Sequence, residues 1–278
     1  MKTRTIKIII LAIIAFAGTA CYTHAQDTMY VYKAGAVVSK RAIVQIDSIT
    51  FKTSLQNIAV TDIDGNVYHT VTIGTKTWMV ENLRTTKYRN GDIIGTTSFP
   101  TKSISAENTP KYQWPWNGNE SDAAYYGRLY TWYAVSDNRN IAPIGWHVAS
   151  DTEWTILENF LISNGYNYDG TITGNKIAKS LASNTDWFTS SYIGVIGNDL
   201  TKNNTSGFTA LPCGIRYDFE SLVFFLDMGY YCYWWTSSEQ ISGHAWIRYM
   251  SGSFYDSISL FRNYSSGAWG YSVRCVKD

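Results

Sequence analysis

The sequence is poor in charged residues, which make up only 16% of it against about a quarter of an average soluble domain. Basic and acidic residues also nearly balance, at 23 against 22, so no strong field attracts nucleic acid or an anionic membrane. We therefore expect no nucleic-acid partner. The surface has to rely on Ser, Thr, Asn and Tyr instead of charge.

Histidine and cysteine, the residues of many catalytic and metal sites, are also scarce. The four histidines lie far apart in the chain, and no motif unites them with a nucleophile or a second ligand. No cysteine pair has zinc-site spacing. We predict no catalytic residue, metal or cofactor. Cys213, Cys232 and Cys275 are expected to be buried small hydrophobes; the alternative is a disulfide from Cys275 to either of the others.

The chain has no hydrophobic run of the roughly 20 residues that a spanning helix needs. Its longest apolar stretch, residues 8–16, follows three basic residues and precedes small ones, the pattern of a secretory signal. Cleavage after Ala25 makes residues 1–25 a signal peptide. The alternative is cleavage before Cys21, which would carry a lipid anchor. We expect an extracytoplasmic protein, secreted or on the cell surface or outer membrane, with membrane contact only through Cys21.

Residues 26–56 contain two short strand-like runs, "MYVYK" and "DSITF", and form a β segment too small for a core of its own. Residues 57–278 are predicted to form one main domain. It begins with two hairpins, whose turns lie at Asp64-Gly65 and at Gly74. Residues 84–145 are polar and irregular, and long ordered loops are uncommon unless they serve a function.

The clearest helix signal starts at Ser150, a good N-cap residue with Glu153 three positions later to complete a capping box. An apolar stripe of Trp154, Leu157, Phe160 and Leu161 follows, and Asn164-Gly165 ends the helix. Asp151 and Glu153 are thus interpreted as helix-start acids and His147 as a packed, hydrogen-bonded histidine. A second short helix is predicted over residues 175–183, with Ile177, Ala178 and Leu181 facing inward.

The last 49 residues, 230–278, are rich in Trp, Tyr, Ser and Gly. They divide into "YYCYWWTS", "HAWIRYM", "SFYDSISLF" and "GYSVRCVK", separated by turn signals that predict an antiparallel meander. Alternation assigns Ala245, Ile247 and Tyr249 to one buried face. It assigns Trp246 and Arg248 to the opposite, outward face.

We predict the ligand-binding surface on the loops and outward positions of this meander. Small neighbours leave aromatic faces open there, and arginines bring planar donors. The candidate contacts are Tyr231, Tyr233, Arg248, Tyr255, Asp256, Arg262 and Tyr264. The alternative is that these tyrosines only cover the sheet, because aromatic residues are favoured in strands. The second choice of site is the segment "KYQWPWNGNE", residues 111–120.

Several segments, in order, resemble one known family. "DIDGNVYHTVTIGTKTWMVENLRTTKYRNGD", "YGRLYTWYAV", "GWHVASDTEWTILENFL", "SGFTALPCGIR", "WWTSSE" and "YSVRCVKD" are similar to the Fibrobacter succinogenes major paralogous domain, over about residues 57–278. The resemblance implies an exported bacterial protein, often a lipoprotein. It also implies an α+β, C-type-lectin-like fold shared with the formylglycine-generating enzyme group, with two helices, a small mixed or antiparallel sheet and long irregular loops. "DSITF" resembles a leader segment of Bacteroidetes surface proteins.

Two departures limit what this resemblance carries over. Formylglycine-generating enzymes use closely spaced cysteines near the C-terminus, whereas Cys232 and Cys275 are far apart here. The sequence triplets of calcium-dependent lectins are missing. We therefore predict a surface-exposed, adhesin-like binding module that is not an enzyme and that recognises a glycan or a protein, since Tyr, Trp, Ser and Asn suit such contacts. The alternative is a structural subunit of a surface fibre or layer; an enzyme of the formylglycine-generating type ranks below both.

Overall fold

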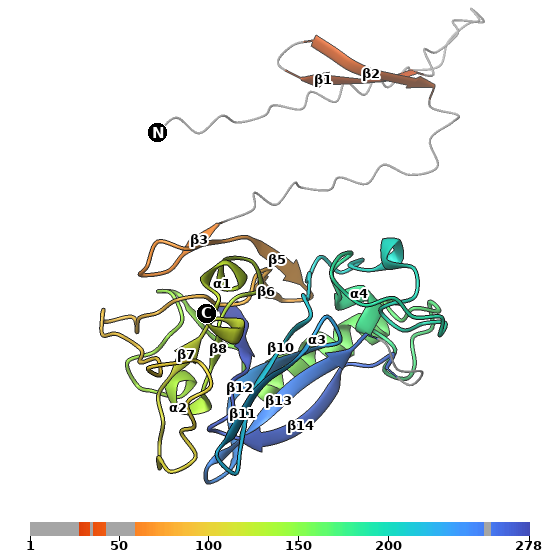
Figure 1. Cartoon of the computed structure of the whole chain (residues 1–278). Helices are drawn as coiled ribbons and strands as arrows, with labels where there is room; N and C mark the ends of the chain where they lie inside the picture. Colours follow the sequence, from red (N-terminus) through yellow and green to blue (C-terminus); the bar gives the residue numbers. More distant parts are fainter. Residues whose placement is uncertain (1–27, 34–35, 43–58, 253–256) are drawn as a thin grey trace, which may run out of the picture. The chain divides into compact units, whose positions relative to one another are not determined.

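The computed structural model describes residues 28–33, 36–42, 59–252 and 257–278, and over residues 28–42 the backbone alone (Figure 1). The chain divides into two compact units, residues 1–54 and 55–278. In the first unit, β1 (Thr28–Lys33) pairs antiparallel with β2 (Ala36–Ala42). Cys21, the predicted signal peptide and "DSITF" lie outside the described residues.

The second unit is α+β, as predicted, with short helices and several sheets. Its described helices are α1 (Glu120–Tyr126), α2 (Trp132–Val135), α3 (Asp151–Ser163) and α4 (Ala178–Leu181), with 3-10 turns η2 (Trp116–Gly118) and η3 (Leu200–Lys202). Only α3 exceeds two turns. The unit is therefore held together mainly by its sheets.

The largest sheet has the strand order β11-β10-β12-β13-β14, with β15 beside β12. Its strands are β10 (Cys213–Phe219), β11 (Leu222–Met228), β12 (Tyr231–Ile241), β13 (His244–Ser251), β14 (Phe261–Ser266) and β15 (Ser272–Val273). The strands β12, β13 and β14 form the predicted antiparallel meander. The third strand, however, begins only at Phe261, so Arg262 and Tyr264 are strand residues and not loop residues.

The predicted final strand "GYSVRCVK" does not extend this meander. Its first half, β15, pairs with β12 in parallel, and its second half, β16 (Cys275–Lys277), enters another sheet. Between them Arg274 is fully buried, and its guanidinium donates to the carbonyls of Met79 and Phe208 at 2.9 and 2.8 Å. The chain therefore passes from one sheet to another at Arg274. Local alternation does not reveal this change, because the acceptors lie far away in the sequence.

The second sheet has the order β5-β6-β16-β9, with β5 (Thr70–Ile73), β6 (Lys76–Met79) and β9 (Trp146–Val148). Two small pairs complete the fold: β3 (Val60–Thr61) with β4 (Val67–Tyr68), and β7 (Gln113–Trp114) with β8 (Leu129–Tyr130). The two predicted hairpins are thus confirmed as β3-β4 and β5-β6.

Both faces of the large sheet are packed, which corrects the prediction of one buried and one outward face. Trp235, Ala245 and Ile247 belong to one buried cluster. Trp234 and Met250, their neighbours along the strands, belong to another with residues of α3, which contacts β12 and β13 (Figure 1). The reason is that β12 is apolar at successive positions, the pattern of a strand buried on both sides.

Helix α3 agrees closely with its prediction. Ser150 caps it in a capping box, in which the Glu153 amide donates to Ser150 Oγ and the Ser150 amide to Glu153 Oε2. Trp154, Leu157 and Leu161 are buried, and Phe160 is partly buried. Helix α4 is shorter than predicted because flanking groups are engaged elsewhere. The Asn175 side chain bonds both backbone groups of Leu260, and the Ser183 amide donates to Ala210.

The predicted inward residues of α4, Ile177, Ala178 and Leu181, are all buried. The three described cysteines, Cys213, Cys232 and Cys275, are free and buried, which confirms their interpretation as small core residues.

Candidate functional site

A groove of about 440 Å³ lies on the face of the large sheet opposite α3. Its lining comes from β10, β11, β12, β13, β14 and the segment that precedes β15: Ile215, Tyr217, Leu226, Tyr231, Tyr233, Ile247, Tyr249, Asn263, Tyr264, Ser265, Trp269 and Tyr271. Seven of these twelve residues are aromatic, and none is charged. We call this feature the aromatic groove.

The tyrosines of the groove stack on one another across the strands. Tyr233 stacks on Tyr231, Tyr249 and Tyr271, with ring centroids 5.6, 5.5 and 5.2 Å apart and nearly parallel planes. Tyr249 in turn stacks on Phe261 at 5.0 Å. The strand register produces this order, because Tyr233 lies opposite Tyr249 and Tyr249 opposite Phe261. Such rings need little further ordering when they contact a ligand.

The other wall of the groove comes from β10 and the loop after β14. Tyr217 meets Trp269 at 4.5 Å in an edge-to-face contact. The Trp269 indole N–H donates to the carbonyl of Asp218 at 3.1 Å, which fixes the ring. Aromatic pairs and a satisfied indole thus hold both walls in place.

The carboxyl group of Asp227, on β11, bonds one of the groove tyrosines. The Tyr233 hydroxyl donates to Asp227 Oδ2 at 3.2 Å. Burial raises the pKa of Asp227, and this hydrogen bond offsets only part of the effect. Within the described residues, no group of histidines, cysteines and acids has the arrangement of a metal site.

The predicted contact residues separate onto different parts of the sheet. Tyr231 and Tyr233 line the aromatic groove, and Tyr264 borders it, with its ring against His244 and Trp246. Arg248 and Arg262 instead bind groups on α3, on the other side. Tyr255 and Asp256 lie outside the described residues.

The expectation that Arg248 points outward is wrong, because only 1% of the residue is exposed. Its Nη2 binds Asp151 Oδ1 at 2.8 Å, and its Nη1 binds Glu158 Oε2 at 3.0 Å. Arg262 binds the same Asp151 at 2.8 Å and lies over the ring of Trp246. Both arginines therefore tie the sheet to α3. Arg262 keeps 43% of its side chain exposed, away from the groove rings.

Sequence reasoning missed Tyr217, Asp227 and Trp269. The first two lie on the β10-β11 hairpin, whose signal was available: two runs with aliphatic and aromatic residues, "CGIRYDF" and "LVFFLDM", separated by two residues. Trp269 had no local signal, since its position at the groove depends on contacts with Tyr217 and Tyr271 and on its hydrogen bond to Asp218.

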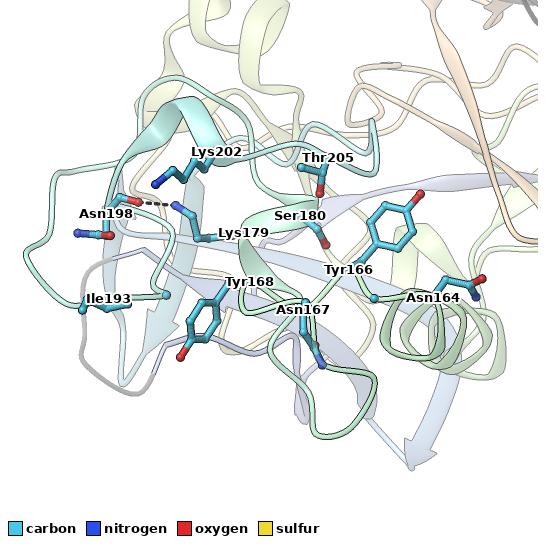
Figure 2. Close-up of a pocket in the computed structure, with 13 residues that line it drawn as sticks. Asn164, Tyr166, Asn167, Tyr168, Lys179, Ser180, Ile193, Asn198, Lys202 and Thr205 are labelled. Carbon is cyan, nitrogen blue, oxygen red and sulfur yellow. Dashed lines mark hydrogen bonds between the residues drawn. The ribbon is translucent and has the colours of Figure 1, made fainter. Parts of the chain in front are cut away.

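A second, more polar cavity of about 580 Å³ lies between the end of α3, α4 and the loops around residues 164–170 and 193–205 (Figure 2). Figure 2 shows Lys179 directed from α4 toward Asn198, whose carbonyl accepts from its Nζ. Nζ also donates to the carbonyl of Asp199 at 3.1 Å and lies 3.4 Å from that of Val195. Burial lowers the pKa of Lys179. This ammonium group holds a loop in place. None of the predicted contacts that the structure describes lines the cavity.

The second-choice segment, residues 111–120, is largely structural. Trp114 is buried, and its indole N–H donates to Thr97 Oγ1 at 2.8 Å. Lys111 pairs with Asp137 at 2.7 Å. The aromatic groove is consequently the better candidate of the two sequence-predicted surfaces.

Comparison with known proteins identifies the family. The model of the Fibrobacter succinogenes major domain matches residues 71–277, most of the chain. The chain belongs to this family. No curated protein and no solved structure matches it. None of the helices in the described ranges has the length and hydropathy needed to cross a membrane.

Proposed function

We propose that this protein is an exported binding module of the cell exterior that holds its ligand in the aromatic groove. The observation that carries the proposal is the groove itself, in which stacked tyrosines from β12, β13 and the segment before β15 line a cavity whose twelve described lining residues are all uncharged. Rigid aromatic contacts give a large contact area at low entropic cost. The ligand is a glycan or a protein.

The finer description of fold and location also belongs to this proposal. Family membership and a capped helix packed on a strand-rich sheet support a C-type-lectin-like fold. The basic and apolar start of the sequence supports export, with Cys21 as the site of a lipid anchor. Burial raises the pKa values of the Cys213 and Cys275 thiols, which does not favour thiolate chemistry of the formylglycine-generating type.

One observation favours the second candidate, a subunit of a surface fibre or layer. Strand β11 ends the order of the large sheet and exposes Leu222, Phe224 and Leu226 at 60%, 45% and 41%. An apolar edge strand is a template for pairing with another chain. Sedimentation of the mature protein separates the candidates: a fibre subunit assembles without ligand, whereas a binding module stays small.

The binding role is tested on the mature protein with a broad screen of glycans and exterior proteins. The double variant Tyr217→Ser with Tyr231→Ser should weaken the interaction found at least about tenfold, by removing two large contacts. Tyr168→Ser is the matched control, because Tyr168 lines the second cavity. If circular dichroism shows intact folds and only Tyr168→Ser weakens binding, the site is the second cavity.

A further inference from the structure

The carboxyl group of Asp227 lies beside the aromatic groove, bonded to the hydroxyl of the lining residue Tyr233. Asp227 is half-buried, and within the described residues its side chain bonds only the Tyr233 hydroxyl. Among the described residues, no lysine, arginine or histidine forms an ion pair with it. A partly buried carboxylate of this kind costs free energy until a cation or further donors reach it.

Asp227 has an unusual backbone conformation. Its φ is 69°, in the left-handed region, and it lies at the gap in the β10-β11 register, opposite Gly214 with φ 63°. At Gly214 a Cβ atom would come within 2.3 Å of the Leu226 carbonyl oxygen, so glycine is required there. Strained residues held in place by their surroundings are typical of functional sites.

The rest of the groove suits the same ligand chemistry. Tyrosine hydroxyl oxygens can accept hydrogen bonds from N–H donors, and the Asn263 side-chain oxygen, which accepts from the Tyr264 amide at 2.9 Å, has room for a second donor. The aliphatic stem of a long basic side chain packs well on rings such as Tyr217 and Trp269. No cation of the groove lining repels such a group.

We infer that the aromatic groove receives a lysine or arginine side chain of a protein partner, with the Asp227 carboxylate as its counter-ion. The inference rests on the proposed binding function and narrows its ligand from glycan or protein to a protein with an exposed basic residue. Charge-assisted hydrogen bonds to a carboxylate are stronger than neutral ones, which makes Asp227 the selective element.

The test uses the mature protein and short glycine-flanked peptides that carry arginine or lysine, with citrulline and norleucine peptides as neutral counterparts. Binding is followed through the NMR signal of the Trp269 indole N–H, assigned with a Trp269→Phe variant. We expect the arginine and lysine peptides to shift this signal at millimolar concentration and the neutral ones not to. Added salt should weaken the effect, as screening requires.

Two variants locate the counter-ion. Asp227→Asn keeps the shape and tolerates the left-handed backbone, and it should lower the affinity for the basic peptides at least about tenfold. Glu220→Gln removes the same charge from the exposed hairpin turn and should leave the affinity unchanged. Tyr233→Phe removes the hydroxyl that donates to Asp227 but keeps the ring, so it should retain or raise the affinity for the basic peptides. This variant tests the inference even if Asp227→Asn folds poorly.

Equal binding of citrulline and arginine peptides, parental affinity in Asp227→Asn, or no shift with any basic peptide would each overturn the inference. These results do not decide the proposed function, which has its own test. If a neutral oligosaccharide or another protein loses affinity in the Tyr217→Ser, Tyr231→Ser variant but not in Asp227→Asn, the groove is a binding site of different selectivity.

Discussion

Asp151, in the first turn of α3, accepts a hydrogen bond from the buried guanidinium of Arg248, 97 positions along the chain in β13, at 2.8 Å. The same carboxylate binds Arg262 of the neighbouring strand β14. One helix-start acid thus pairs with two arginines that lie opposite each other on adjacent strands, and Glu158 pairs with Arg248 as well. The ion pairs of Asp151 with Arg248 and Arg262, which we call the clamp, hold α3 against the sheet whose other face carries the aromatic groove.

Asp151→Asn should lower the free energy of unfolding by about 1.5 to 3 kcal/mol, because Arg248 then loses a charged hydrogen-bond acceptor while its charge stays buried. Glu158 still binds Arg248, so the fold should survive. Chemical denaturation measures the loss. Glu220→Gln, which removes an exposed acid, is the control, and equal stability of both variants would show that the clamp contributes little.

This clamp also shows what the sequence alone conveys. The cap of α3 and its apolar stripe were predictable, because Ser150, Glu153 and Trp154 lie within one or two turns. The hairpin turns at Gly65 and Gly74 were predictable for the same local reason, since both have positive φ. The burial of Arg248 was not, because alternation indicates a face but not what covers that face.

The candidate site was predictable only in part for a related reason. Tyr231 and Tyr233 belong to a strand with a clear signal, and they line the groove. Strand β14 reads "FRNYSS", with little apolar alternation, and is a strand because it pairs with β13 from His244 to Tyr249. Asp227 could be placed only once the positive φ values of the β10-β11 pair were known.

Trp154→Ala should destabilise the domain by about 3 to 5 kcal/mol, because a fully buried indole leaves a large cavity. Its ring packs on Trp78, Phe208 and Trp234 at centroid distances of 5.0 to 5.6 Å. Thermal and chemical unfolding measure the loss. Ile156→Ala, on the exposed side of the same helix, should change stability little, and a parental melting curve for Trp154→Ala would contradict this packing.

Ser150→Ala should cost about 1 kcal/mol, the usual contribution of an N-cap side chain. The Glu153 amide then loses its acceptor, 3.2 Å away, while the reciprocal bond from the Ser150 amide remains. Ser150→Thr keeps the hydroxyl, which also donates to Glu153 Oε2 at 2.9 Å, and should restore stability, so a loss of equal size in both variants would argue against capping.

From the contacts of His147 we expect the stability of the fold to depend on pH. Burial lowers the pKa of His147, but hydrogen bonds to Asp278 and Glu153, at 2.6 and 2.9 Å, outweigh it, and the net pKa lies above the usual 6.5. A raised pKa means that the folded state binds the proton more tightly. The contribution is fully present below pH 6.5 and is lost as the pH rises through the folded pKa. His147→Asn should flatten the fall in unfolding free energy over this interval; an unchanged slope would assign it to other groups.

The position of signal cleavage relative to Cys21 determines whether a lipid attaches the protein to the membrane. If the signal is cleaved before Cys21, cells fed a palmitate analogue should yield labelled, membrane-bound protein, and Cys21→Ala should abolish both. If cleavage follows Ala25, the mature protein should begin at Gln26 and carry no label. Mass spectrometry of the N-terminus separates these outcomes, and label in the Cys21→Ala protein would contradict a lipid on this residue.

Lys179→Met should loosen the loop that borders the second cavity. The methionine keeps the buried stem but removes the donors that reach the carbonyls of Val195, Ile196 and Asp199. Because Val195 and Ile196 are fully buried, water replaces these bonds poorly, and the variant should lose about 1 to 3 kcal/mol. Part of this loss is offset, because the variant no longer has to bury a positive charge. The lowered pKa of Lys179 reflects the free-energy cost of that burial.

The matched control is Lys202→Met, since that side chain is 75% exposed and pairs with Asp199 at the surface. It should change stability by no more than about 0.5 kcal/mol. Hydrogen exchange at residues 195–199 gives the second readout, because loss of the fastening should raise local opening there in Lys179→Met alone. Equal exchange in the two variants would mean that packing, and not the buried ammonium group, holds this loop closed.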